Sequence, residues 1–194
     1  QTLGWGVAAV VLLGAFALWE LRRAQPMLDL RLFRNPRFSA ASIAITLVFF
    51  AMFGYSFLVT QYFQFVRGYS TLEAGLHTLP FAFAAGIAAP IAARLALRFG
   101  TTRVVAAGLA SMSIGFAWAS TLDVDTPYWS VIVPQMIFIA AGLTITTAPS
   151  TEAILGSLPK EKAGVGSAVN DTTRELGGTL GVAVVGSVFS SLYG

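Results

Sequence analysis

The chain has 194 residues, of which 56% are hydrophobic and only 11% carry a charge. Soluble domains average about 25% charged residues, so the composition favours a membrane protein over a soluble helical core. The net charge of +3 is small, and no basic stripe with interleaved aromatics accompanies it, so we expect no nucleic-acid partner. With no cysteine and a single histidine, we expect no disulfide, no metal site and no other cofactor.

Six apolar stretches divide the chain, and most approach the length of about 20 residues that a helix needs to cross a bilayer. We therefore predict an all-α, polytopic membrane bundle of about six transmembrane helices. The stretches cover approximately residues 3–19, 38–64, 72–93, 104–122, 129–150 and 176–193.

Basic residues are concentrated in alternate gaps between these stretches. The gap 20–37 holds five arginines and the gap 94–103 holds three, whereas the two gaps of the other set hold only Arg67. Because Lys and Arg mark cytoplasmic loops, the pattern predicts that the chain begins and ends on the outer side. The topology predicts a multi-pass protein, and we expect the plasma membrane, as in a bacterial inner membrane.

Both ends of the sequence are abrupt. It begins without Met, enters an apolar stretch within a few residues, and has no charged region or cleavage site typical of a signal peptide. It stops at Gly194, where the last stretch reaches the outer surface. We expect a piece of a longer protein.

Two of the cytoplasmic gaps each allow two interpretations. Residues 20–37 alternate leucines with charges between two prolines, which suits a chain lying in the inner interface, although a plain connector is also possible. In 94–103, Gly100 permits a tight turn between two helices. Arg98 and Arg103 flank that turn, either as positive-inside anchors or as a latch that holds one transport state.

The last helix, from Gly164, carries the most chemistry. Gly177 and Gly181 form a GxxxG pair that lets another helix approach closely. Asp171 and Glu175 lie beside Arg174, within one turn of it. The residues that share one helical face at steps of three or four are Ser167, Asn170, Arg174, Gly177 and Gly181.

Arg174 lies about 27 Å before Leu192 along a helix, which places it near the inner boundary of the membrane. It could be a snorkelling or locally paired residue, or part of a cytoplasmic gate whose charges pair in one conformation and separate in the other. Glu152 reaches the same surface, with Arg174, Arg98 and Arg103 as possible partners.

Polar or aromatic residues well inside the stretches are candidates for a substrate cavity. Unpaired amides are costly in lipid, so the glutamines are the strongest of them. The candidates are Tyr55, Gln61, Tyr62, Gln135, Phe138 and Asn170. No carboxylate lies near the middle of a stretch, so we expect any proton-coupling acid outside this chain. Glu73 and His77 share one face at an outer helix start and could form a protonatable pair.

Several runs resemble, in order and spacing, the C-terminal half of the fourteen-helix drug/proton antiporters of the major facilitator superfamily. These runs are PMLDL (26–30), LFRN (32–35), FS (38–39), GYS (68–70) with AG (74–75), RLA (94–96) with RFG (98–100), and much of the stretch 164–186. Leu97 replaces the acidic position of the family's loop signature, and Thr101 and Thr102 stand where basic residues often occur. The loop therefore keeps only Arg98, Gly100 and Arg103 of that signature.

The resemblance implies a division of the chain. Residues 1–37 would form a linker transmembrane helix and its cytoplasmic connector, and residues 38–194 an incomplete C-terminal bundle without its last helix. The N-terminal half of the same protein, the lipid bilayer, a small-molecule substrate and protons would be its partners. Transport by rocking of two halves around a central site would follow.

We therefore expect a proton-coupled secondary transporter that exports drug-like or amphipathic solutes. The alternatives are a facilitator of another solute, such as a lipid or metabolite, and a non-transporting membrane scaffold. An enzyme is not expected, because the sequence has no HExxH motif, no nucleophile–base pair and no deep cluster of acids.

Overall fold

The computed structural model describes residues 2–22, 30–159 and 162–193, and these residues form helices joined by short turns. A 3₁₀ turn, Leu30–Arg34, precedes the second helix, and π turns extend two helices at Tyr62–Val66 and Tyr128–Ile132. The α-helices are α1 (Thr2–Arg22), α2 (Pro36–Gln61), α3 (Thr71–His77), α4 (Leu79–Phe99), α5 (Thr101–Ala119), α6 (Val133–Gly156) and α7 (Ala163–Tyr193).

Five helical segments of the described residues are long and apolar enough to cross a membrane, and this confirms the predicted fold class. α1 covers the first predicted stretch, although several of its side chains lie outside the described residues. The five segments are Pro36–Val66, Thr71–Phe99, Thr101–Ala119, Tyr128–Gly156 and Ala163–Leu192.

The helices begin where the sequence supplies local signals. Asn35 accepts a hydrogen bond from the backbone N–H of Arg37 at 3.0 Å, and Pro36 occupies the first turn of α2, where its missing N–H costs nothing. Ser70 and Glu73 form a capping box at the start of α3. Gly100, with φ of 84°, is the single residue between α4 and α5.

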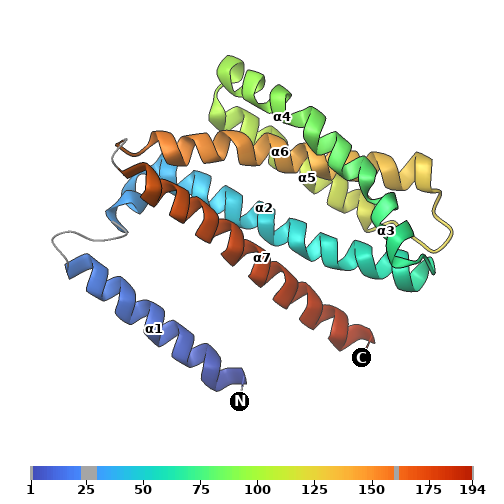
Figure 1. The fold of residues 1–194 in the computed structure, drawn as a ribbon, viewed down its shortest axis with the longest axis horizontal. Coiled ribbons are helices and arrows are strands. Elements are labelled where there is room, and N and C mark those ends of the chain that lie inside the picture. The colour runs from blue at the N-terminus through green and yellow to red at the C-terminus, as the bar shows by residue number, and fades with distance from the viewer. Residues whose placement is uncertain (1, 23–29, 160–161, 194) are drawn as a thin grey trace.

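α6 lies at the centre of the bundle and packs against α2, α4 and α5, whereas α7 packs mainly along α2 (Figure 1). α2 and α7 run in the same direction, as the predicted topology requires for the second and sixth stretches. α1 lies apart from the other helices in this view. The arrangement leaves α4 and α7 on opposite sides of α6 and α2.

Two buried clusters hold the bundle together. The larger one joins α2, α5 and α6 through residues such as Val48, Met112 and Ile139. The smaller one joins the first turns of α2 to α6 and α7 through Phe38 and Ile154, which are fully buried. Close packing of these side chains fixes α2 against α6 at both ends of the molecule.

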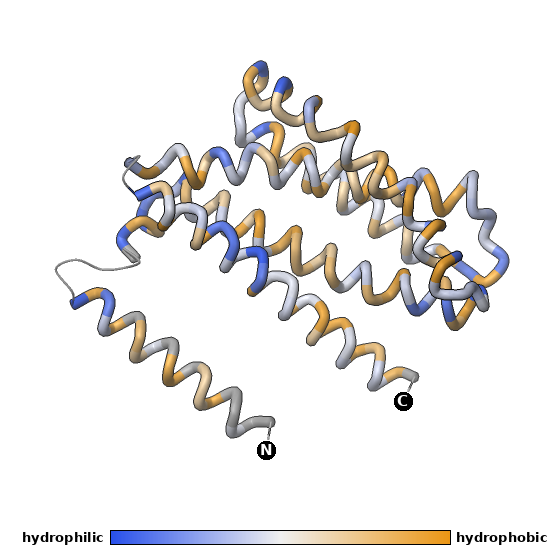
Figure 2. Tube along the Cα trace, viewed as in Figure 1, coloured by the Kyte–Doolittle hydropathy of each residue, from blue (hydrophilic) through white to orange (hydrophobic). Residues whose placement is uncertain are grey.

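Large apolar side chains also cover the outside of the helices. Phe83 and Ile87 on α4 are 68% and 66% exposed. Hydrophilic residues gather at the helix ends and in the first half of α7 (Figure 2). Such surfaces suit a protein surrounded by lipid, because apolar side chains there face acyl chains instead of water.

Candidate functional site

Arg174 occupies a place on α7 between α2 and α6. Its guanidinium donates a hydrogen bond to Thr151 Oγ1 on α6 at 3.2 Å, and its Cζ lies 5.2 Å from the ring centroid of Phe49 on α2. Arg174 Nε is buried and has no hydrogen-bond partner. A cation held over an aromatic face by one hydroxyl keeps unused capacity to bind an anion.

Thr151 links Arg174 to a second polar side chain. Its hydroxyl donates to Asn170 Oδ1 at 3.1 Å, and Asn170 is only 6% exposed. The chain Arg174–Thr151–Asn170 therefore connects α6 and α7 through side chains alone. Thr151 was not predicted from the sequence, because a threonine inside an apolar helix usually bonds to its own backbone and gives no distinguishing pattern.

No carboxylate neutralises this cation within the described part of the chain. Glu152, Asp171 and Glu175 are exposed, and none of them forms an ion pair with Arg174, Arg98 or Arg103 among the described residues. α7 begins at Ala163, so Arg174 lies well inside a helix that starts earlier than the predicted stretch 176–193. The structure thus holds the predicted gate charges apart.

The turn between α4 and α5 brings together the residues of the predicted loop signature. Gly100 supplies the left-handed backbone, and the Arg98 guanidinium carbon lies 5.2 Å from the ring centroid of its neighbour Phe99. Arg103 is exposed in the first turn of α5. The three residues share one end of the bundle, but the two arginines do not contact Glu152.

Two of the predicted cavity residues, Tyr55 and Gln135, form a buried pair between α2 and α6. Tyr55 Oη lies 3.3 Å from both Oε1 and Nε2 of Gln135. Gln135 is fully buried, and the ring of Phe116 packs edge-on against Tyr55 with centroids 5.7 Å apart. Each partner satisfies the other in an otherwise apolar setting.

The remaining cavity candidates do not join this pair. Tyr62 lies at the outer end, where it accepts a hydrogen bond from Arg67 Nε and donates one to the carbonyl of Asp123, each at 2.9 Å. Gln61 precedes it and is half-buried, while Phe138 is 40% exposed beside Trp118. Tyr62 therefore ties down a loop in this structure.

The glycines of α7 lie where α2 comes closest. A Cβ atom at Gly177 would overlap the carbonyl oxygen of Thr46, and one at Gly181 would overlap the carbonyl of Phe50. Gly54 on α2 matches them from the other side, since its Cβ would come within 2.7 Å of Val185. Backbones at this separation leave no room for any side chain larger than hydrogen.

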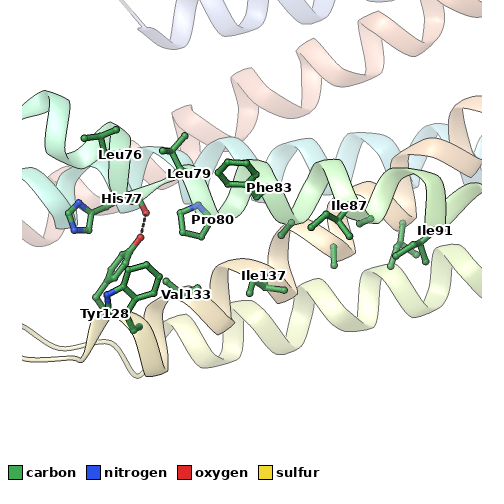
Figure 3. A pocket seen from close by; sticks show the side chains of 15 residues that line it. Leu76, His77, Leu79, Pro80, Phe83, Ile87, Ile91, Tyr128, Val133 and Ile137 are labelled. Atoms are coloured by element: carbon green, nitrogen blue, oxygen red, sulfur yellow. Dashed lines mark hydrogen bonds between the residues drawn. The ribbon is translucent and has the colours of Figure 1, made fainter.

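An open, apolar groove of about 800 Å³ follows α4 and α6 (Figure 3). Phe83, Ile87 and Ile137 point along it, and His77 and Tyr128 mark one end. Tyr128 Oη donates to the carbonyl oxygen of His77 at 2.8 Å. This groove was not predicted from the sequence, because an apolar helical face has the same residue pattern whether it contacts lipid, a ligand or another helix.

Glu73 and His77 both make local contacts at the start of α3 and at its end. Glu73 caps α3 through Ser70, and His77 Nδ1 lies 2.8 Å from the carbonyl oxygen of Glu73. Rings of Tyr69 and Tyr128 pack on the imidazole with centroids 4.5 and 4.6 Å away. The carboxylate and the imidazole therefore do not contact each other directly.

Several known proteins are similar in sequence to this chain. It is 32% identical to the multidrug resistance protein Stp of Mycobacterium tuberculosis over 97% of this chain and 36% of that protein. It is also 32% identical to the tetracenomycin C resistance and export protein of Streptomyces glaucescens, over 100% of this chain and 36% of the relative. The multidrug efflux pump LfrA of Mycolicibacterium smegmatis is 32% identical over 92% of this chain and 35% of its own length.

The chain therefore spans little more than a third of these relatives. Residues 2–182 match the family described as Major Facilitator Superfamily. That match covers nearly every helix described above, including the α4–α5 turn and most of α7. The chain belongs to the major facilitator superfamily.

Proposed function

We propose that the chain is the larger part of the C-terminal half of a transporter that exports drug-like or amphipathic solutes. The observation that carries this proposal is the apolar groove along α4 and α6. Its volume of about 800 Å³ falls within the range of 300 to 1,000 Å³ typical of small-molecule sites. The printed names of the relatives, which include resistance, export and efflux, agree with such a solute.

The groove would form one wall of the solute path. It is lined almost wholly by apolar side chains and is open along its length, so it needs a second wall from the rest of the protein. Apolar walls with aromatic ends accept many amphipathic shapes, because hydrophobic contact carries little directional information. His77 and Tyr128 would supply the few polar contacts that orient a solute.

Arg174 would act as an inner gate charge in this transporter. In the present arrangement it contacts Phe49 and Thr151 and has no acidic partner among the described residues. A conformational change that brings a carboxylate to the free Nε would create an ion pair in one state only. The acid would be Glu152, Asp171 or Glu175, or a residue of the other half.

Proton coupling completes the proposal. Aside from Glu20 at the end of α1, the described acids of these helices occupy exposed positions. None of these acids, Glu20 included, lies near the middle of an apolar stretch, so we place the coupling acid in the part of the transporter that lies beyond this chain. Export would then follow alternating access between two halves, with proton entry driving the cycle.

The test uses the complete transporter in inverted membrane vesicles with an imposed proton gradient. Dissipation of the gradient is followed after addition of cationic dyes. Wild type should show dye-dependent proton movement, Arg174→Ala should lose it, and Arg94→Gln, an exposed change near the α4–α5 turn, should keep it. No response of wild type to any dye would overturn export of cationic drugs. Full activity of Arg174→Ala would overturn the gate.

A further inference from the structure

A second pocket, of about 640 Å³, lies at the end of the bundle that carries the α4–α5 turn. It is bounded by the start of α2, the start of α5 and the last turns of α6. The positive-inside pattern places this end at the cytoplasmic face of the membrane. The two pockets share no lining residue, so this pocket is separate from the groove along α4 and α6.

Ser150 on α6 provides the first sign of an absent ligand. It lines the pocket, it is fully buried, and its Oγ has no hydrogen-bond partner. A buried hydroxyl without a partner is uncommon, because the lost hydrogen bond to water is not replaced. The hydroxyl is therefore available as a donor to a group that enters the pocket.

The start of α5 provides a second, independent donor set. Gly100 is its N-cap and makes no side-chain hydrogen bond to the helix. Asn35 and Ser70, in contrast, cap the starts of α2 and α3 with their side chains. The first backbone N–H groups of α5, at Thr101 and Thr102, consequently face the pocket region without a cap, and a helix N-terminus attracts anions.

The charges around the pocket agree with an anionic ligand. Arg37 and Arg103 both line it, and none of the described lining residues is acidic. Two guanidinium groups, a helix N-terminus and a buried hydroxyl together match the oxygens of a phosphate group. The pattern differs from simple positive-inside anchoring, which requires arginines at a membrane surface but no buried hydroxyl.

We propose that this pocket binds a phosphate group. A phospholipid of the inner leaflet and soluble phosphate present the same chemistry, and the lining favours the lipid. Ala40, Val105 and Ala153 give the pocket an apolar part that a free ion would leave empty. The anionic inner leaflet also supplies such headgroups at high local concentration.

Binding is measured on the complete transporter, purified in detergent and stripped of lipid. A fluorescent phosphatidylglycerol reports occupancy, and its displacement is followed with short-chain phosphatidylglycerol and with inorganic phosphate. Ser150→Ala and Arg103→Gln should each weaken binding about tenfold, as expected for the loss of a hydrogen bond to a charged group. Arg94→Gln removes a neighbouring arginine that does not line the pocket and should bind as wild type does.

The displacement results distinguish the two sources of the phosphate group, and the variants test the proposal itself. Displacement by short-chain lipid alone identifies a headgroup site, and displacement by inorganic phosphate as well identifies a site for phosphate in general. Equal affinity in wild type, Ser150→Ala and Arg103→Gln would overturn the proposal. Ser150→Ala is small enough to keep the fold, and an unchanged unfolding temperature verifies this. Because the readout is binding, it does not depend on whether the protein exports drugs.

Discussion

The α2–α7 and α4–α6 pairs differ in how closely their helices approach. α2 and α7 meet through Gly54, Gly177 and Gly181, where even a methyl group would overlap the opposing helix. α4 and α6 touch through small residues such as Ala88, but bulky side chains on their outer faces leave a long apolar groove. Residue size at the contact therefore decides whether two apolar helices form a tight seam or a binding surface.

The largest loss of stability should follow from adding a side chain where α2 and α7 meet most closely. Gly181→Leu should destabilise the protein by about 3 kcal/mol or more, because the new atoms meet the Phe50 backbone, which cannot move away. The temperature of unfolding in detergent measures the effect. Gly186→Leu on the same helix is the control, since nothing lies within 4 Å of a Cβ there. Equal stability of the two variants would contradict the tight seam.

The next largest effect concerns Tyr55 and Gln135, the polar pair that joins α2 to α6. Tyr55→Phe should cost about 1 to 3 kcal/mol, because it leaves the fully buried Gln135 amide without this partner. The double variant Tyr55→Phe/Gln135→Leu should recover part of the loss. A double-mutant cycle on unfolding temperature measures the coupling. Strict additivity would mean that the pair is not coupled.

Thr151→Val tests the side-chain link between α6 and α7. It removes the acceptor of Arg174 and the donor to Asn170, so we expect a loss of about 1 to 2 kcal/mol together with reduced dye-dependent proton movement. Thr144→Val is matched to it, because that hydroxyl bonds to the Ala140 carbonyl within α6. A loss of stability with unchanged transport would show that Thr151 contributes to stability alone.

The smallest effect on stability should come from the groove. Phe83→Ala removes an exposed ring from the wall, so unfolding should shift by less than about 0.5 kcal/mol. The KM for an aromatic dye should rise several-fold, since ring contacts are worth about 0.5 to 1.5 kcal/mol. Phe65→Ala, whose ring is 80% exposed outside the groove, should leave KM unchanged. Equal KM values for Phe83→Ala and Phe65→Ala would contradict the proposal that the groove is part of the solute path.

Sequence reasoning worked best where a residue's role depends on its own helix. The apolar stretches, the turn at Gly100 and the break near Pro36 follow from hydropathy and backbone preferences, and they appear as helices and helix ends. The π turns at Tyr62–Val66 and Tyr128–Ile132 were not predicted, because no local residue pattern specifies them. Helix ends also ran past the predicted stretches, since a helix continues after the hydrocarbon ends.

The candidate site was harder to predict because its contacts cross between helices. Tyr55 and Gln135 were each selected as polar residues at depth, yet their pairing depends on the rotation of α2 against α6. The partner of Arg174 was sought among acids, whereas Thr151 and Phe49 hold it in the structure. The buried hydroxyl of Ser150 gave no signal at all, since serine is common in membrane helices.

The single residue between α4 and α5 has a mechanical consequence. α4 ends at Phe99 and α5 begins at Thr101, so the connection has no slack to absorb relative displacement. Residues 157–162, in contrast, separate α6 from α7. A tilt of α4 would therefore tilt α5 with it. The motion would pass from α5 to α6 through their shared packing. The three helices α4, α5 and α6 would turn as one lever.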